Sequence, residues 1–283
     1  MWDLNTNLET RGRYQGETQT LFAAEVTSVN HPDIAWFDGA FTAVSQWYWA
    51  IGRTSFTSLP AALEIAADWD AGEGGSEHKA PSIAANRDGD TWRLAWASYH
   101  GDRIYLKTLL SGEAVPTDLD FQAAEIEVEG IPLQGYAGWP RVAVDADLGI
   151  HLAWHDWVAS GDEREFRAVD YRHLPHPGLQ PALSTLLDVP LGDVGSVSPA
   201  VAVGDAGDVV VTFGSNLPSG GSVYFCLREA GQSDFPGGAV PLEEDRMGSP
   251  YTPAAAPWGE RFWLLYNGKQ GDQVHAVLLR RAP

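Results

Sequence analysis

Apolar and polar residues alternate in short runs along this chain, and one arrangement of runs returns five times. Each copy opens with a proline and several small or β-branched residues, passes through a turn containing Asp or Gly, and ends in an apolar run that reaches an aromatic residue. The prolines lie 49, 59, 59 and 54 residues apart and are Pro32, Pro81, Pro140, Pro199 and Pro253. Alternating runs joined by tight-turn residues predict pairs of antiparallel strands, and their recurrence predicts a repeat architecture.

Further alternating runs follow the strand pair in most copies. The third runs include residues 103–109, 166–172 and 222–228, and the fourth runs include residues 62–67, 121–128, 182–189 and 239–242. Four short strands per unit are typical of a blade of a β-propeller. The sequence therefore predicts an all-β fold, a five-bladed β-propeller whose four-stranded antiparallel blades begin near residues 31, 80, 139, 198 and 252.

The fifth copy has no fourth run before Pro283. Residues 18–27 resemble the fourth runs of the other copies, so we expect this N-terminal strand to complete the last blade and remove an unpaired edge. Residues 1–283 then form a single propeller domain. A two-sheet sandwich or a pair of small β domains is the alternative, because regularly spaced short strands are common to all of these folds.

The charge of the chain narrows the range of partners. With 38 acidic and 18 basic residues, the formal net charge is −20, which repels phosphate backbones and anionic lipids. We therefore expect no nucleic acid and no membrane partner. We also expect a monomer that binds a small molecule, and we expect no cofactor. Cys226 is the only cysteine, so an internal disulfide is excluded. The first residues lack the pattern of a secretory signal, so we expect a cytoplasmic protein, or a secreted one if a signal was removed.

In a propeller, function usually resides in the loops that enter the first strand and leave the second strand of each blade. The residues in these loops differ among the five copies, which favours one asymmetric central pocket over a ring of equivalent sites. The candidate ligand-binding residues are His31, Trp47, Trp49, His78, Tyr99, His100, Trp139, Arg141, Trp157, Asn216, Tyr251 and Asn267. The aromatic residues that end the second strands are expected to pack between blades instead, and these are Trp96, Trp154, Phe213 and Tyr266.

The candidate catalytic residues are Asp33, Asp156 and His155. Asp33 follows the first repeat proline, and Asp156 lies in a loop of the third blade. Glycoside hydrolysis needs two carboxyl groups, one ionised and one protonated, and these two aspartates are the candidate pair. His155 is an alternative proton donor, although adjacent residues of an extended strand point to opposite sides, so at most one of His155 and Asp156 is expected to face the channel.

Several of the loop residues are histidines, a common type of metal ligand. They are His31, His78, His100 and His155, and they come from separate blades. Their spacing does not show that they converge, so we predict no metal site.

The runs of residues 31–41 and 80–96 resemble the blade openings of five-bladed arabinanase and furanosidase-type glycoside hydrolases. The resemblance implies that Asp33 is the general base and that further acids come from the second and third blades. In this sequence Ser82 stands at the second-blade position, and Asp156 is the acid of the third-blade loops.

A weaker resemblance links residues 86–92 to the Asp box of sialidase-like propellers. No residue separates Asp88 from Gly89, whereas that box has one, and Arg141 is the only evident counterpart of the arginine trio of those enzymes. This second resemblance therefore bears on the architecture more than on the chemistry.

An enzyme that acts on a small polar or sugar-like molecule is the leading hypothesis, and a glycoside hydrolase is its most concrete form. One alternative is a cyclase, lyase or isomerase of specialised metabolism, because the loop tryptophans could form an aromatic wall that stabilises a cation. Another alternative is a lectin-like propeller that binds carbohydrate without turnover.

Overall fold

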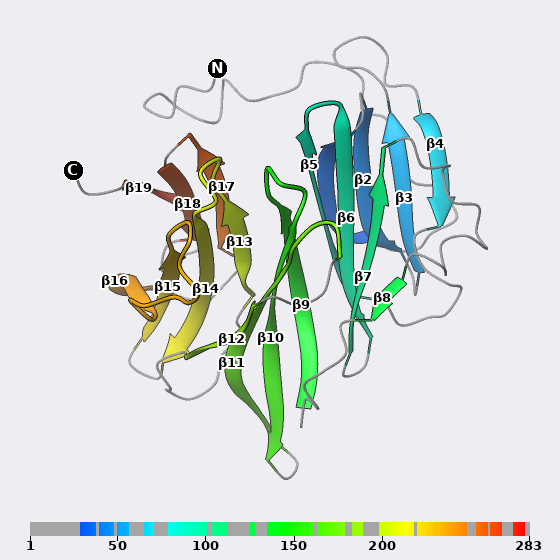
Figure 1. Cartoon of the computed structure of the whole chain (residues 1–283). Coiled ribbons are helices and arrows are strands. Elements are labelled where there is room, and N and C mark those ends of the chain that lie inside the picture. Colours follow the sequence, from blue (N-terminus) through cyan, green and yellow to red (C-terminus); the bar gives the residue numbers. More distant parts are fainter. Residues whose placement is uncertain are drawn as a thin grey trace.

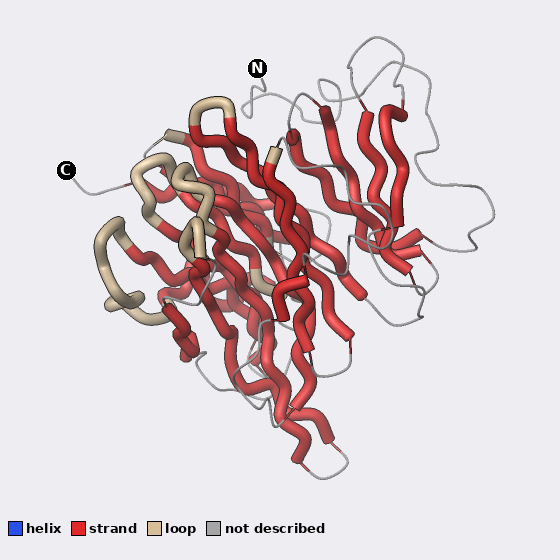
Figure 2. Tube along the Cα trace, turned by 45° about the vertical axis from the view of Figure 1, so that its right-hand side comes forward, coloured by secondary structure: helices blue, strands red, loops and turns tan. Residues whose placement is uncertain are grey.

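The computed structural model describes residues 29–37, 40–47, 50–56, 65–70, 79–100, 103–111, 125–127, 135–160, 163–178, 183–188, 198–217, 220–247, 253–259, 261–267 and 274–280. Within these ranges every regular element is a strand, as Figure 2 shows. The all-β prediction is therefore confirmed. These ranges include no helix with the length and apolar character that crossing a membrane would require.

The described strands form five antiparallel sheets in which consecutive strands lie side by side, and Figure 1 shows them in chain order from blue to red. The first sheet contains β1 (Val29–Phe37), β2 (Ala40–Trp47), β3 (Ala50–Phe56) and β4 (Ile65–Asp70). The second contains β5 (Lys79–Asp88), β6 (Thr91–His100), β7 (Arg103–Leu110) and β8 (Glu125–Glu127). The third contains β9 (Gly135–Val144), β10 (Ile150–Ser160), β11 (Glu163–Leu174) and β12 (Leu183–Asp188). The fourth contains β13 (Ala200–Val203), β14 (Val209–Leu217), β15 (Gly220–Arg228) and β16 (Val240–Met247), and the fifth contains β17 (Ala254–Trp258), β18 (Arg261–Asn267) and β19 (Val274–Arg280).

The first strands of the sheets contact one another in chain order: β1 contacts β5, β5 contacts β9, β9 contacts β13, and β13 contacts β17. Each therefore serves as the inner strand of its sheet, and the successive strands lie farther out. This arrangement is that of a β-propeller. Residues 18–27, expected to add a strand to the last sheet, lie outside the described residues.

Apolar side chains fill the spaces between consecutive sheets. Trp96 packs with Phe37 between the first two sheets, and Trp154 packs between the second and third. Phe213 lies between the third and fourth sheets, and Tyr266 packs with residues of the fourth. The exposed fractions of Trp96, Trp154, Phe213 and Tyr266 are 3% or less. The prediction that these aromatic residues pack between sheets is confirmed.

In the second, third and fourth sheets, a described turn containing Asp and Gly joins the inner strand to the next strand. Gly89 and Gly207 occupy two of these turns with φ of 56° and 86°, a conformation that glycine adopts without a steric cost. Because the strands are antiparallel, these turns lie at one end of the sheets, and the residues that enter the inner strands lie at the other end.

Candidate functional site

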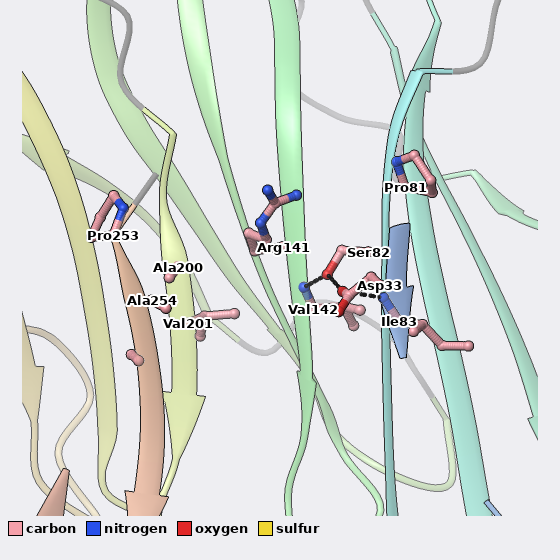
Figure 3. Close-up of a pocket in the computed structure, with 11 residues that line it drawn as sticks. Asp33, Pro81, Ser82, Ile83, Arg141, Val142, Ala200, Val201, Pro253 and Ala254 are labelled. Atoms are coloured by element: carbon pink, nitrogen blue, oxygen red, sulfur yellow. Dashed lines mark hydrogen bonds between the residues drawn. The ribbon is translucent and has the colours of Figure 1, made fainter. Parts of the chain in front are cut away.

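The inner strands of all five described sheets contribute residues to the lining of one cavity of about 490 Å³. The lining residues are 33 on β1, 81–83 on β5, 141–142 on β9, 200–201 on β13, and 253–255 at β17. Figure 3 shows these residues facing a common space. A space shared by every sheet can hold one ligand in contact with side chains that are far apart in the sequence.

The residue after each repeat proline belongs to the wall of this cavity. These equivalent positions hold Asp33, Ser82, Arg141, Ala200 and Ala254. Asp33 and Ser82 lie on one side in Figure 3, the two alanines lie on the other, and Arg141 lies between them. The five equivalent positions thus give the cavity a polar side and an apolar side, because their residue types differ.

A β-bulge precedes the lining residue in each of the first three sheets. In the second sheet, Lys79 pairs with Tyr99 and Ser82 pairs with Ala97, so two residues of β5 oppose one residue of β6. The same irregularity interrupts the pairing of β1 with β2 and of β9 with β10. A repeat proline lies in each bulge, where its missing N–H costs no ladder hydrogen bond. Bulges commonly redirect a side chain beside a site, and here each one leads directly into a lining residue.

Two of the bulges contain residues in the left-handed region. Ala80 has φ of 45° and Trp139 has φ of 51°, and each precedes a repeat proline. A residue with a side chain pays about 1–2 kcal/mol for this conformation. The surrounding sheet holds both residues in it, so strained backbone lies just before the lining residues of β5 and β9, as is common at functional sites.

Asp33 is fixed by three hydrogen bonds. Its Oδ2 atom accepts one from the Ser82 hydroxyl and one from the Ile83 backbone N–H, both at 3.0 Å, and its Oδ1 atom accepts one from the Ile34 N–H at 3.0 Å. The Ser82 oxygen also accepts a hydrogen bond from the Val142 N–H at 3.3 Å. Asp33 and Ser82 therefore tie β1, β5 and β9 together and hold the carboxylate in one orientation at the cavity wall.

Arg141 is half-buried in the same wall, and it donates a hydrogen bond to the Pro140 carbonyl at 3.0 Å. Burial lowers the pKa of Arg141, and the nearby Asp33 carboxylate raises it. The guanidinium stays protonated, because arginine does not lose its proton in proteins. The cavity thus holds a fixed anion on β1 and a cation on β9.

Comparisons with known proteins identify the fold. No family model matches the sequence, and no curated protein is significantly similar to it. Penicillium chrysogenum α-L-arabinanase complexed with arabinobiose matches with a TM-score of 0.56 and 11% identity, over 89% of this chain and 76% of that chain. A thermostable family-43 glycoside hydrolase matches with a TM-score of 0.51 and 10% identity, over 90% of this chain and 93% of that chain. The chain has the β-propeller fold of the family-43 glycoside hydrolases.

The predicted resemblance to arabinanase and furanosidase-type enzymes is thereby confirmed at the level of the fold. An α-L-arabinofuranosidase from Lactobacillus brevis, at 15% identity and a TM-score of 0.48, covers 88% of this propeller and is itself covered over 89% of its length. Identities this low describe how the chain folds, and the chemistry has to be argued from the side chains.

Two of the predicted site residues, Asp33 and Arg141, line the cavity of the propeller. Three others gather where the inner strands begin: the Trp139 ring lies 6.3 Å from the Tyr99 ring and 6.4 Å from the His155 ring, measured between centroids. His155 is only 1% exposed, and a Cβ atom added to Gly138 would lie 2.4 Å from its Nε2 atom. A proton donor has to reach the ligand, and this burial argues against that role for His155.

The side chains of the remaining predicted site residues lie outside the described part of the chain, so their roles stay predictions. These residues are His31, Trp47, Trp49, His78, His100, Asp156, Trp157, Asn216, Tyr251 and Asn267. The backbone pairing places Trp47 opposite Val29 and Asp156 opposite Ala137. Both positions therefore lie at the end of the sheets where the inner strands begin.

The sequence analysis missed a second polar cluster, at the opposite end of the third sheet. The Asp145 Oδ2 atom lies 2.9 Å from the His151 Nε2 atom and 3.4 Å from the His173 Nε2 atom. The His151 Nδ1 atom lies 2.6 Å from the Tyr171 hydroxyl. His151 and His173 are directly paired on β10 and β11.

Burial and hydrogen bonding set the protonation of this cluster. Burial lowers the pKa of His151 to about 4, partly opposed by its hydrogen bond to Asp145. Burial acts to raise the pKa of Asp145, but hydrogen bonds from His151, His173 and the Gly149 N–H outweigh it and hold the pKa well below its usual range. A neutral His151 that donates to an ionised Asp145 is the stable combination.

The ligand atoms of Asp145, His151 and His173 all lie within 4.8 Å of one another, a separation that a metal ion could bridge. The two imidazole rings, however, are stacked with centroids 4.3 Å apart and planes 13° apart. An imidazole binds a metal along a lone pair in the plane of its ring, and two stacked rings cannot direct both lone pairs at one ion. The described geometry is therefore a hydrogen-bonded cluster.

Proposed function

We propose that the protein is a glycoside hydrolase-like enzyme that binds a small sugar or glycoside in the central cavity, with Asp33 at the reacting centre. The observation that carries the proposal is a carboxylate held by hydrogen bonds in the wall of the cavity that the inner strands line. The Penicillium arabinanase, which shares the fold, is complexed with arabinobiose, and this supports a carbohydrate as the ligand.

Asp33 suits the role of general base. Its carboxylate takes the proton of a water molecule while the water oxygen forms a bond to the anomeric carbon. The bond from that carbon to the leaving oxygen breaks at the same time, and a second group must protonate that oxygen. Asp156 is the candidate for this second group, as the sequence predicts. The hydrogen bonds from Ser82 and Ile83 hold Asp33 in place through the reaction.

The apolar part of the described lining suits a sugar as ligand. Among the described lining residues there is no aromatic side chain, and the apolar part is made of Ala, Val, Ile and Pro. A small apolar surface opposite a polar one suits the two faces of a sugar ring.

A lectin-like function remains the second candidate because Asp33 is the only carboxylate among the described lining residues. A binding module needs a fixed polar group but not a pair of carboxyl groups. Binding alone would survive the loss of the charge on Asp33, whereas general-base catalysis would not.

The test is hydrolysis of a panel of 4-nitrophenyl glycosides, including α-L-arabinofuranoside, β-D-xyloside and α-D-galactoside, by the wild type and by Asp33→Asn. We expect release of nitrophenol from at least one substrate and a loss of about 10²–10⁴-fold in kcat for Asp33→Asn, the usual contribution of a general base. Asp205→Asn, which makes the same substitution at an exposed turn, is the matched control. Full turnover by a folded Asp33→Asn protein would remove Asp33 from the mechanism, and binding without turnover would favour the lectin.

A further inference from the structure

The charge pattern of the cavity distinguishes between neutral and acidic sugars. The described lining contains one cationic side chain, Arg141, and one anionic side chain, Asp33. All other described lining residues are uncharged. Any charged group on a ligand in this space would therefore meet Arg141 or Asp33.

Arg141 has no ion-pair partner among the described residues. Its one hydrogen bond within this part of the chain goes to the carbonyl of Pro140, the residue next to it. The chain has 38 acidic and 18 basic residues, so carboxylates outnumber the cationic side chains with which they can form ion pairs. An arginine in a cavity wall that makes no ion pair with a described carboxylate keeps most of its donors for a ligand.

Asp33 does not take up these donors. Its two oxygens accept hydrogen bonds from Ser82, Ile83 and Ile34, which fix the carboxylate toward β5. Asp33 affects Arg141 through space, since it raises the pKa that burial lowers. The pair is thus an anion and a cation held apart on neighbouring parts of one wall.

We propose that the cavity recognises a sugar acid, and that Arg141 binds its carboxylate. A guanidinium offers two parallel N–H donors that match the two oxygens of a carboxylate, and such charge-assisted pairs are among the stronger hydrogen bonds in proteins. The wall opposite Asp33 and Ser82 is made of small apolar side chains, including Ala200, Val201 and Ala254, and it leaves space for a sugar ring. A hexuronic acid presents a carboxylate to Arg141 while its hydroxyl groups reach the polar side. This inference rests on the proposed sugar-binding function of the cavity and names its substrate class.

The experiment is calorimetric titration of the full chain with D-galacturonate and D-galactose, which differ only in the group at C6. We expect the acid to bind about 10- to 100-fold more tightly, the effect of one added charge-assisted hydrogen-bonded pair. Arg141→Gln should abolish this difference, and Arg141→Lys, which keeps the charge but loses the paired donors, should reduce it. D-glucuronate and D-mannuronate, with their neutral parent sugars, extend the test to other ring configurations.

Arg87→Gln is the matched control, because Arg87 is exposed and its guanidinium stacks on Trp92 away from the cavity residues. It should keep the preference for the acid. Thermal melts of all variants confirm that they are folded, and Arg141→Lys decides the outcome if Arg141→Gln does not fold.

Equal affinity for each acid and its neutral parent would overturn the inference, as would retention of the preference by Arg141→Gln. Absence of binding to all three acids, or tighter binding of galactose 6-phosphate than of galacturonate, would also overturn it. These failures are distinct from failure of the proposed function. Cleavage of neutral glycosides without a preference for acids would support the proposed hydrolase and contradict the preference for sugar acids. Arg141-dependent binding of acids without cleavage of any glycoside would support the preference for sugar acids and contradict the hydrolase.

Discussion

Acidification should destabilise this protein through His151 before Asp145 is protonated. His151 is 2% exposed, and burial lowers its pKa from 6.5 to about 4 in the folded state. The neutral ring donates a hydrogen bond from Nε2 to Asp145 and accepts one at Nδ1 from the Tyr171 hydroxyl. The charges of His173 and Arg228 oppose a positive charge on the ring. Unfolding releases the ring into water, where it binds a proton near its ordinary pKa.

The sign and size of the effect follow from this difference. A histidine whose pKa is lowered by folding contributes its full stabilisation above about pH 6.5, and this contribution decreases as the pH falls toward 4. A difference of about 2.5 between the two pKa values corresponds to about 3 kcal/mol in the free energy of unfolding. Asp145 acts in a separate, more acidic range, because its pKa is already lowered from 3.8 and it stays ionised across the range of His151.

The assay is urea unfolding at several pH values between 7.5 and 4.5, with the wild type, His151→Gln and His275→Gln. Glutamine at position 151 keeps hydrogen-bonding groups but does not titrate, so this variant should lose most of the pH dependence in the range. His275→Gln removes a histidine that stacks on Tyr266 far from Asp145 in the fold, and its curve should follow the wild type. A wild-type curve that is flat down to pH 4.5, or an unchanged decline in His151→Gln, would refute the reasoning.

Three further predictions concern packing and positioning. Gly138→Ala should lower the free energy of unfolding by about 1–3 kcal/mol in urea titrations, because the new methyl group would clash with the buried His155 ring. Gly237→Ala is the control, because a methyl group there meets nothing within 4 Å. Equal effects of the two substitutions would contradict the packing of His155 against Gly138. Ser82→Ala should lower the free energy of unfolding by about 1–2 kcal/mol in the same assay, because it removes the hydrogen bonds to Asp33 and Val142. In the proposed enzyme it should reduce kcat by about tenfold with little change in KM, because the Asp33 carboxylate loses a hydrogen bond that orients it. A change in KM alone would contradict this positioning role. Tyr171→Phe should lower the stability by about 1–2 kcal/mol because the His151 Nδ1 atom loses its partner, and an unchanged melting temperature would show that this hydrogen bond contributes nothing.

Much of the fold could be predicted from the sequence because the repeat fixes the strands locally. A proline, a turn with Asp or Gly and an aromatic residue recur in each unit, and the structure places a sheet at each one. The burial of Trp96, Trp154, Phe213 and Tyr266 follows from their equivalent positions. Closure of the last sheet by residues 18–27 stays a prediction.

The cavity was predictable in part. Asp33 and Arg141 could be identified because they follow repeat prolines, and Ser82 occupies the same position. The bulges before these residues were not predicted, since the register of a strand pair depends on the partner strand as well as on the local sequence. The burial of His155 could not be predicted from the sequence, because its ring lies against Gly138, where a side chain would clash with it.

The Asp145 cluster was missed because its members are separated along the chain. His151 and His173 face each other only because the register of β10 with β11 shifts by one residue between Asp156 and Trp157. Regular pairing from Ser160 and Glu163 would place Arg172 opposite His151, so the sequence alone does not predict this contact. Asp145, in the preceding turn, then completes the cluster.

The central claim is that the space between the inner strands is the binding site of the protein. A crystal structure of the protein soaked with D-galacturonate tests it most directly. The account predicts electron density for one sugar in the cavity, with its carboxylate against Arg141 and a hydroxyl group directed toward Asp33. Sugar bound only on the outer surface of the sheets, or a cavity filled by the protein's own side chains, would contradict it.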